Sequence, residues 1–93
     1  MIVGILELEV RLFDTMSLKD KRRIIKSLKD RIGNTFKVSV AEVDHNESLR
    51  SSVLGIAMVA NEKRFVESVL HKIVDFVRKN PKLSLIDYNI EMV

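Results

Sequence analysis

The order of its periodic segments is the feature of this sequence that most restricts its fold. Four segments alternate apolar and polar residues or run apolar throughout, which is typical of strands, and two carry apolar residues at helical spacing. In chain order, these segments are residues 2–13, 18–32, 36–44, 53–60, 62–79 and 83–92. The pattern therefore predicts the element order β-α-β-β-α-β.

This order is that of the ferredoxin-like plan, an α+β fold in which a four-stranded antiparallel sheet carries two helices on one face. Right-handed crossovers place the strands in the spatial order 4-1-3-2, numbered along the chain. The two most apolar segments, residues 2–6 and 53–60, then occupy the centre of the sheet. A chain of 93 residues has room for one such core, so we expect a single ferredoxin-like domain over residues 1–93.

Residues with strong positional preferences mark the ends of both helices. Ser17 is a good N-cap, and Asp20, three residues on, can act as its capping-box partner. Gly33, followed by an asparagine, predicts the end of the first helix. Asn61 is expected to cap the second helix, and Pro81 to close it.

The first helix carries an unusual concentration of positive charge. Residues 18–32 contain seven cations and two anions, a net charge of +5; because the whole chain has +3, the remainder has −2. Cations near a helix N-terminus are repelled by the helix dipole, by roughly 0.3–1 kcal/mol each when poorly screened. An anionic partner would turn this repulsion into attraction. Five cations share one flank and form the predicted nucleic-acid-binding site: Lys19, Arg22, Arg23, Lys26 and Lys29.

Two interpretations of this basic helix stay open. Cations spaced roughly 5–6 Å apart along a helix suit non-specific contact with nucleic-acid phosphates. They also suit a solvated helix face whose long side chains cover the edge of the core, and Asp30 can pair with Lys26. Lys21 differs from these cations, because its side chain points in the same direction as the apolar face of the helix. Its ammonium should find a carboxylate or emerge near residues 13–16.

The uncovered face of the sheet is not expected to stack RNA bases, because stacking requires aromatic and cationic side chains there. The first strand instead presents Glu7 and Glu9. Depending on its register, the last strand adds one of two sets, either Asp87, Asn89 and Glu91 or Ile86, Tyr88 and Ile90. If RNA binds, we expect the basic helix to make the contact, through backbone phosphates.

No arrangement of residues predicts an enzyme, a cofactor or a metal site. The chain has no cysteine, which excludes disulfides, thiolate ligands and cysteine nucleophiles. The segment between the first strand and the first helix lacks the glycine-rich phosphate loop of an acylphosphatase. His45, flanked by Asp44 and Glu47, is expected in a solvated loop, and His71 in a surface ion pair on the second helix.

Apolar residues outside the predicted core indicate self-association. Ile5, Val43 and one face of residues 53–60 must point away from the helices, and soluble monomers rarely expose large apolar patches. Leu70 and Val74 also widen the apolar arc of the second helix beyond a single sheet contact. We therefore expect a homodimer, formed through the sheet face or by pairing of edge strands; a monomer with scattered surface aliphatics is the alternative.

The chain is expected to have no membrane contact and a cytoplasmic location. No apolar run approaches the roughly 18–20 residues of a membrane span. The first residues lack the basic leader and cleavage site of a signal peptide. The absence of cysteine, tryptophan and glutamine beside abundant charged residues hints at a heat-loving source, and a chance fluctuation in a short chain is the alternative.

Residues 17–44, SLKDKRRIIKSLKDRIGNTFKVSVAEVD, followed by VLGIAMV at residues 53–59, resemble the YlxP-like family of small bacterial proteins. The similarity covers nearly the whole chain. It implies a ferredoxin-like fold, an unassigned molecular function and, because members are often encoded among translation genes, a role near RNA. Many members have a tryptophan after the second strand, where this chain has residues 47–50, ESLR.

These observations lead to a hypothesis about function. We expect a non-catalytic accessory factor that contacts RNA or a ribonucleoprotein, such as a ribosomal subunit, through the basic first helix. The alternative is a protein–protein interaction module or dimeric structural domain without nucleic-acid binding. A small-molecule enzyme is the third possibility.

Overall fold

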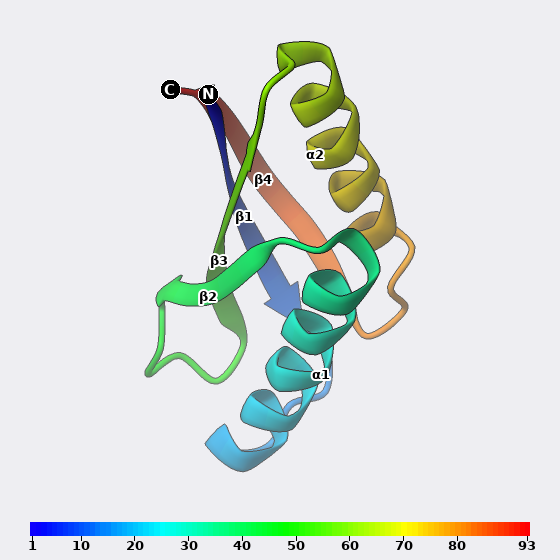
Figure 1. Ribbon diagram of the computed structural model, residues 1–93. Coiled ribbons are helices and arrows are strands. Elements are labelled where there is room, and N and C mark those ends of the chain that lie inside the picture. The colour runs from blue at the N-terminus through cyan, green and yellow to red at the C-terminus, as the bar shows by residue number, and fades with distance from the viewer.

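The computed structural model describes residues 1–93 and shows a sheet covered on one face by two helices (Figure 1). The elements are β1 (Ile2–Leu12), α1 (Leu18–Phe36), β2 (Ser39–Asp44), β3 (Ser51–Ala60), α2 (Lys63–Arg78) and β4 (Leu83–Met92). All strand pairs are antiparallel and the order across the sheet is β2-β3-β1-β4. The predicted ferredoxin-like fold and its strand order are confirmed.

The core lies between the helices and the face of the sheet that they cover. Every second residue of the two central strands points into it, as the period of a strand requires. From the helices it takes Ile25, Leu28, Ile32, Val66, Leu70, Ile73, Val74 and Val77. Leu70 and Val74 are buried in this single core, so the inference that they widen the arc of the second helix for another contact was wrong.

A β-bulge in β4 determines which side chains reach the open face. Leu85 lies opposite Val10 and Asp87 opposite Glu9, so Ile86 has no partner in the ladder and its side chain is 53% exposed. The extra residue lets apolar residues on both sides of the bulge face the helices. It also places Asp87, Asn89 and Glu91 on the open face, which decides between the two registers that the alternation allowed.

Two helix ends differ from their predicted positions. The first helix continues past Gly33 to Phe36 and ends at Lys37, which adopts the left-handed conformation (φ 58°) and donates its N–H to the Gly33 carbonyl. At the start of α2, Glu62 and not Asn61 is the N-cap residue, and it makes no side-chain cap bond. Neither helix is long and apolar enough to cross a membrane.

Candidate nucleic-acid interface

The five predicted site residues lie along one flank of α1, and none of them is among the buried residues of this helix. We call Lys19, Arg22, Arg23, Lys26 and Lys29 the basic flank. Four of these side chains are exposed, and Lys29 is half-buried. Because α1 is a rigid helix of 19 residues, their relative positions are held by its backbone and not by loops.

The start of α1 is capped as predicted, with one difference in detail. The Ser17 hydroxyl accepts a hydrogen bond from the Asp20 N–H at 3.1 Å. The Asp20 carboxylate accepts from the N–H of Met16 at 3.3 Å and not from that of Ser17. The cap therefore satisfies two backbone donors at the helix start and sets the N-terminal boundary of the basic flank.

Intrahelical ion pairs neutralise only part of the basic flank. Lys26 contacts Asp30 at 2.9 Å, as predicted, and Arg23 lies 4.0 Å from Asp20. Both pairs are well exposed, and such pairs contribute about 0.3–0.5 kcal/mol. The other three cations of the flank have no carboxylate within ion-pair distance. The flank thus retains a net positive charge.

Two further cations extend this surface toward α2. Arg31 lies two helical turns after Arg23 on α1, and Lys82 comes from the turn before β4. Both line the same hollow as Arg23. Neither residue belongs to the site predicted from the sequence. The spacing of eight residues between Arg23 and Arg31 could have indicated that Arg31 belongs to the site. Lys82 lies beside α1 only because of the tertiary fold, so no local pattern indicates it.

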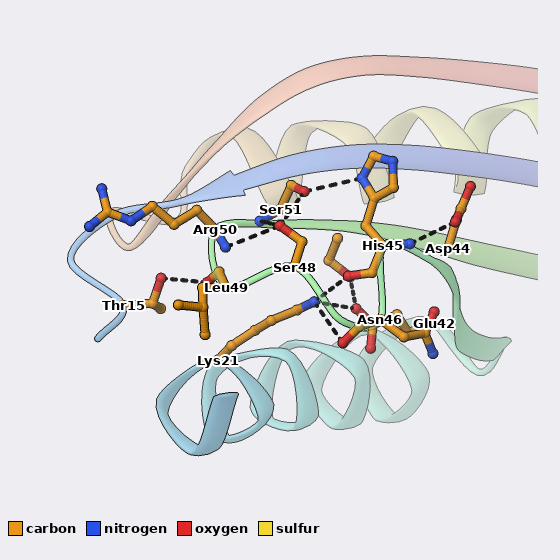
Figure 2. Close-up of polar contacts among 11 residues, drawn as sticks. Thr15, Lys21, Glu42, Asp44, His45, Asn46, Ser48, Leu49, Arg50 and Ser51 are labelled. Atoms are coloured by element: carbon orange, nitrogen blue, oxygen red, sulfur yellow. Dashed lines mark hydrogen bonds and ion pairs between the residues drawn. The ribbon is translucent and has the colours of Figure 1, made fainter. Parts of the chain in front are cut away.

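Lys21 is buried between α1 and the loop that joins β2 to β3, as Figure 2 shows. Its Nζ lies 3.1 Å from a carboxylate oxygen of Glu42 and donates to the carbonyl of His45 at 2.6 Å. The prediction that it would find a carboxylate is confirmed. The Thr15 hydroxyl adds a hydrogen bond to the Leu49 carbonyl at 2.6 Å. These contacts fix the start of α1, and with it the basic flank, to the rest of the fold.

The two histidines are both exposed, and only His45 makes a side-chain hydrogen bond. His45 follows β2 in the loop, where its Nδ1 lies 3.1 Å from the Ser51 hydroxyl (Figure 2). The structure contains no group of three histidine or carboxylate side chains that could hold a metal ion. His71 forms no ion pair, because Glu67 contacts Lys63 and Asp75 contacts Arg78. The predicted surface pair of His71 was wrong.

The open face of the sheet is acidic where it is hollowed. A shallow depression is lined by four carboxylates, and none of them forms an ion pair. They belong to Glu7, Glu9, Asp44 and Asp87. Tyr88, the only aromatic residue in a strand, lies opposite Leu8 on the helix side, where its ring is 5.5 Å from the Arg78 guanidinium. The open face therefore repels phosphates, and it presents no aromatic ring on which bases could stack.

Comparisons with known proteins agree with the resemblance drawn from the sequence. The family described as "Protein of unknown function (DUF503)" matches residues 3–90. The "Uncharacterized protein YlxP" of Bacillus subtilis (strain 168) is 29% identical over 82 residues, which cover 88% of this chain and 89% of that protein. Neither description states a ligand or an activity, so the site must be interpreted from its own geometry.

Proposed function

Since this chain belongs to the DUF503 family of proteins of unknown function, we propose a function from its surface. The protein is a non-catalytic accessory factor that contacts RNA or a ribonucleoprotein, such as a ribosomal subunit, through the basic flank of α1. The contact is made to backbone phosphates and depends on shape and charge, not on the sequence of bases.

The observation that carries this proposal is the separation of charge between the two sides of the molecule. The exposed cations of α1 lie on the helix side, and the unpaired carboxylates of β1, β2 and β4 line the open face of the sheet. A polyanion is attracted to the first surface and repelled by the second. This arrangement orients the protein on RNA without any base contact.

A protein partner with an acidic surface would meet the same cations, so the test must separate the two ligands. We expect a fluorescently labelled RNA hairpin and purified ribosomal subunits to bind the protein with dissociation constants of about 10⁻⁴–10⁻⁶ M, the range of non-specific nucleic-acid binding. Polyglutamate at equal charge concentration should compete poorly, because it lacks the closely spaced phosphates whose condensed counterions are released when cations bind a nucleic-acid strand. Fluorescence anisotropy measures both.

Two results would count against RNA binding. One is the absence of any anisotropy change with RNA and with ribosomal subunits at low salt. The other is displacement of bound RNA by polyglutamate at equal charge, which would favour the protein-interaction module.

We also propose that the protein forms a two-fold homodimer through the open face of the sheet. At the end of this face away from the acidic depression, β1 and β3 are apolar and β4 adds Glu91 at its edge; Val59, on β3, is 61% exposed there. A two-fold axis near the depression would bring carboxylates from Glu7 and Glu9 of both copies together, so the axis must lie nearer Val59. Sedimentation equilibrium at micromolar concentration should give twice the 10.7 kDa mass of one chain.

The substitution Val59→Glu places a charge at the centre of the proposed dimer contact. It should shift the sedimenting species to the monomer without unfolding it, because Val59 is exposed within one chain. A wild-type protein that sediments only at 10.7 kDa would rule out the dimer.

A further inference from the structure

A groove runs between α1 and the turn that joins α2 to β4, residues 79–82. In Figure 1, this turn lies beside the C-terminal half of α1. The groove has a volume of about 340 Å³, at the low end of the range of small-ligand sites. Its polar lining comes from both segments and consists of Arg23, Ser27, Arg31, Asn80 and Lys82.

This lining offers hydrogen-bond donors and positive charge, and no carboxylate lines it. Arg23, Arg31 and Lys82 supply three cations, and Ser27 supplies a hydroxyl. The side-chain oxygen of Asn80, Oδ1, accepts a hydrogen bond from the backbone N–H of Lys82 at 2.9 Å, which leaves the side-chain NH₂ group of Asn80 free to donate. A ligand that suits these groups is an anion with several acceptor oxygens.

Arg31 is held in position for such a ligand by an aromatic pair. Its guanidinium carbon lies 5.0 Å from the centre of the Phe76 ring. Phe76 in turn meets Phe36 edge to face, with ring centres 5.6 Å apart. The guanidinium is planar by resonance, and stacking on a ring restricts its orientation, so it loses less conformational freedom when it binds a phosphate. Arg31 also lines an adjoining hollow with Lys79, so the positive charge continues along the turn.

We propose that this groove binds backbone phosphates of the RNA strand that the basic flank contacts. The inference rests on the proposed function and extends it to residues outside the flank. Arg23 belongs to both surfaces, so a strand can pass from one to the other without a gap. Arg23 and Arg31 lie two turns apart, about 12 Å along the helix axis, which is too far for one free phosphate ion to bridge and suits two phosphates of a strand that are separated by one further phosphate.

The test compares two double variants with the same change in charge. Arg31→Gln with Lys82→Gln removes two groove cations. Arg64→Gln with Lys72→Gln removes two exposed cations of α2 that take part in no ion pair and lie outside both surfaces. Anisotropy with the labelled RNA hairpin is measured for both variants over a series of KCl concentrations.

The groove variant should bind RNA at least tenfold more weakly than the α2 variant at 0.15 M KCl. Its plot of log affinity against log salt should be flatter than that of the wild type by about 1.4–1.8, because each lost phosphate contact removes about 0.7–0.9. Since Arg31 packs on Phe76, the single variant Lys82→Glu provides a second measurement that leaves this packing intact. It should also bind at least tenfold more weakly.

Three outcomes decide the inference. Equal RNA affinities for the groove variant, Lys82→Glu and the α2 variant would overturn phosphate binding by the groove. If variants of the basic flank nevertheless bind RNA more weakly, the proposed function stands without the groove. A wild-type protein that binds no RNA would overturn both. Displacement of RNA by inorganic phosphate at matched ionic strength would overturn the choice of a strand over a free ion.

Discussion

Replacement of Lys21 by methionine is expected to lower the free energy of unfolding by about 2–4 kcal/mol. The side chain of Lys21 is 1% exposed and that of Glu42 is 16% exposed, so the ion pair between them is largely shielded from water. Methionine fills a similar volume but leaves the His45 carbonyl without this donor and the Glu42 carboxylate without a counter-charge, although the Ser52 hydroxyl still donates to Glu42 at 2.6 Å. The expected loss lies slightly below that of a fully buried pair, because water still reaches Glu42. Urea unfolding at neutral pH measures the change.

A matched control is available on the same helix. Lys26 also forms an ion pair, with Asp30 at 2.9 Å, but its side chain is 75% exposed. Lys26→Met should therefore change the free energy of unfolding by less than about 0.5 kcal/mol. The double variant Lys21→Met with Glu42→Leu should recover part of the loss, because no carboxylate is then left unpaired. If Lys21→Met were no more destabilising than Lys26→Met, Lys21 would not fix α1 to the β2–β3 loop.

Local pattern was sufficient for the fold and for part of the candidate site. Alternation and helical spacing predict the element order, and the handedness of crossovers then leaves one strand order, which the structure confirms. The direction of Lys21 follows from helix geometry alone, so its carboxylate partner could be expected before Glu42 was known. The basic flank follows from the same geometry.

Features that depend on tertiary contacts could not be predicted from local pattern. Gly33 is a common helix stop, but here α1 continues for three more residues, and Phe36 then meets the ring of Phe76. Alternation alone did not locate the bulge at Ile86, because the apolar residues before it and those after it follow different registers. The groove joins Arg31 to Lys82, which lie far apart in the chain and meet only because the turn before β4 packs beside α1.

The second large effect is expected at the basic flank. Substitution of Arg22, Arg23 and Lys26 together by glutamine should abolish detectable RNA binding at 0.15 M KCl, because it removes three of the five cations of the basic flank. The side chains of Arg23 and Lys26 are 71% and 75% exposed, and Arg22 is exposed, so no core contact is lost. The free energy of unfolding should stay unchanged or rise slightly, because repulsion from the helix dipole and among neighbouring cations is removed.

The control for this variant carries the same loss of charge on α2. Lys63, Arg64 and Lys72 are exposed, and all three can be replaced by glutamine without touching the basic flank or the groove. This control should retain most of the RNA affinity, because long-range attraction is screened beyond about 8 Å at physiological ionic strength. If the flank variant unfolded in the absence of urea, the aliphatic parts of these three side chains would be covering the edge of the core. That result would favour the interpretation of the flank as a solvated helix face.

The salt dependence of RNA binding tests phosphate contact by α1 most directly. Log affinity is measured against log KCl concentration for the wild type, the flank variant and the α2 control, starting at low salt where all three can still bind. Three lost phosphate contacts should flatten the slope of the flank variant by about 2.1–2.7, while the slope of the control stays near that of the wild type. A flank variant with the slope and affinity of the control would contradict phosphate binding by α1.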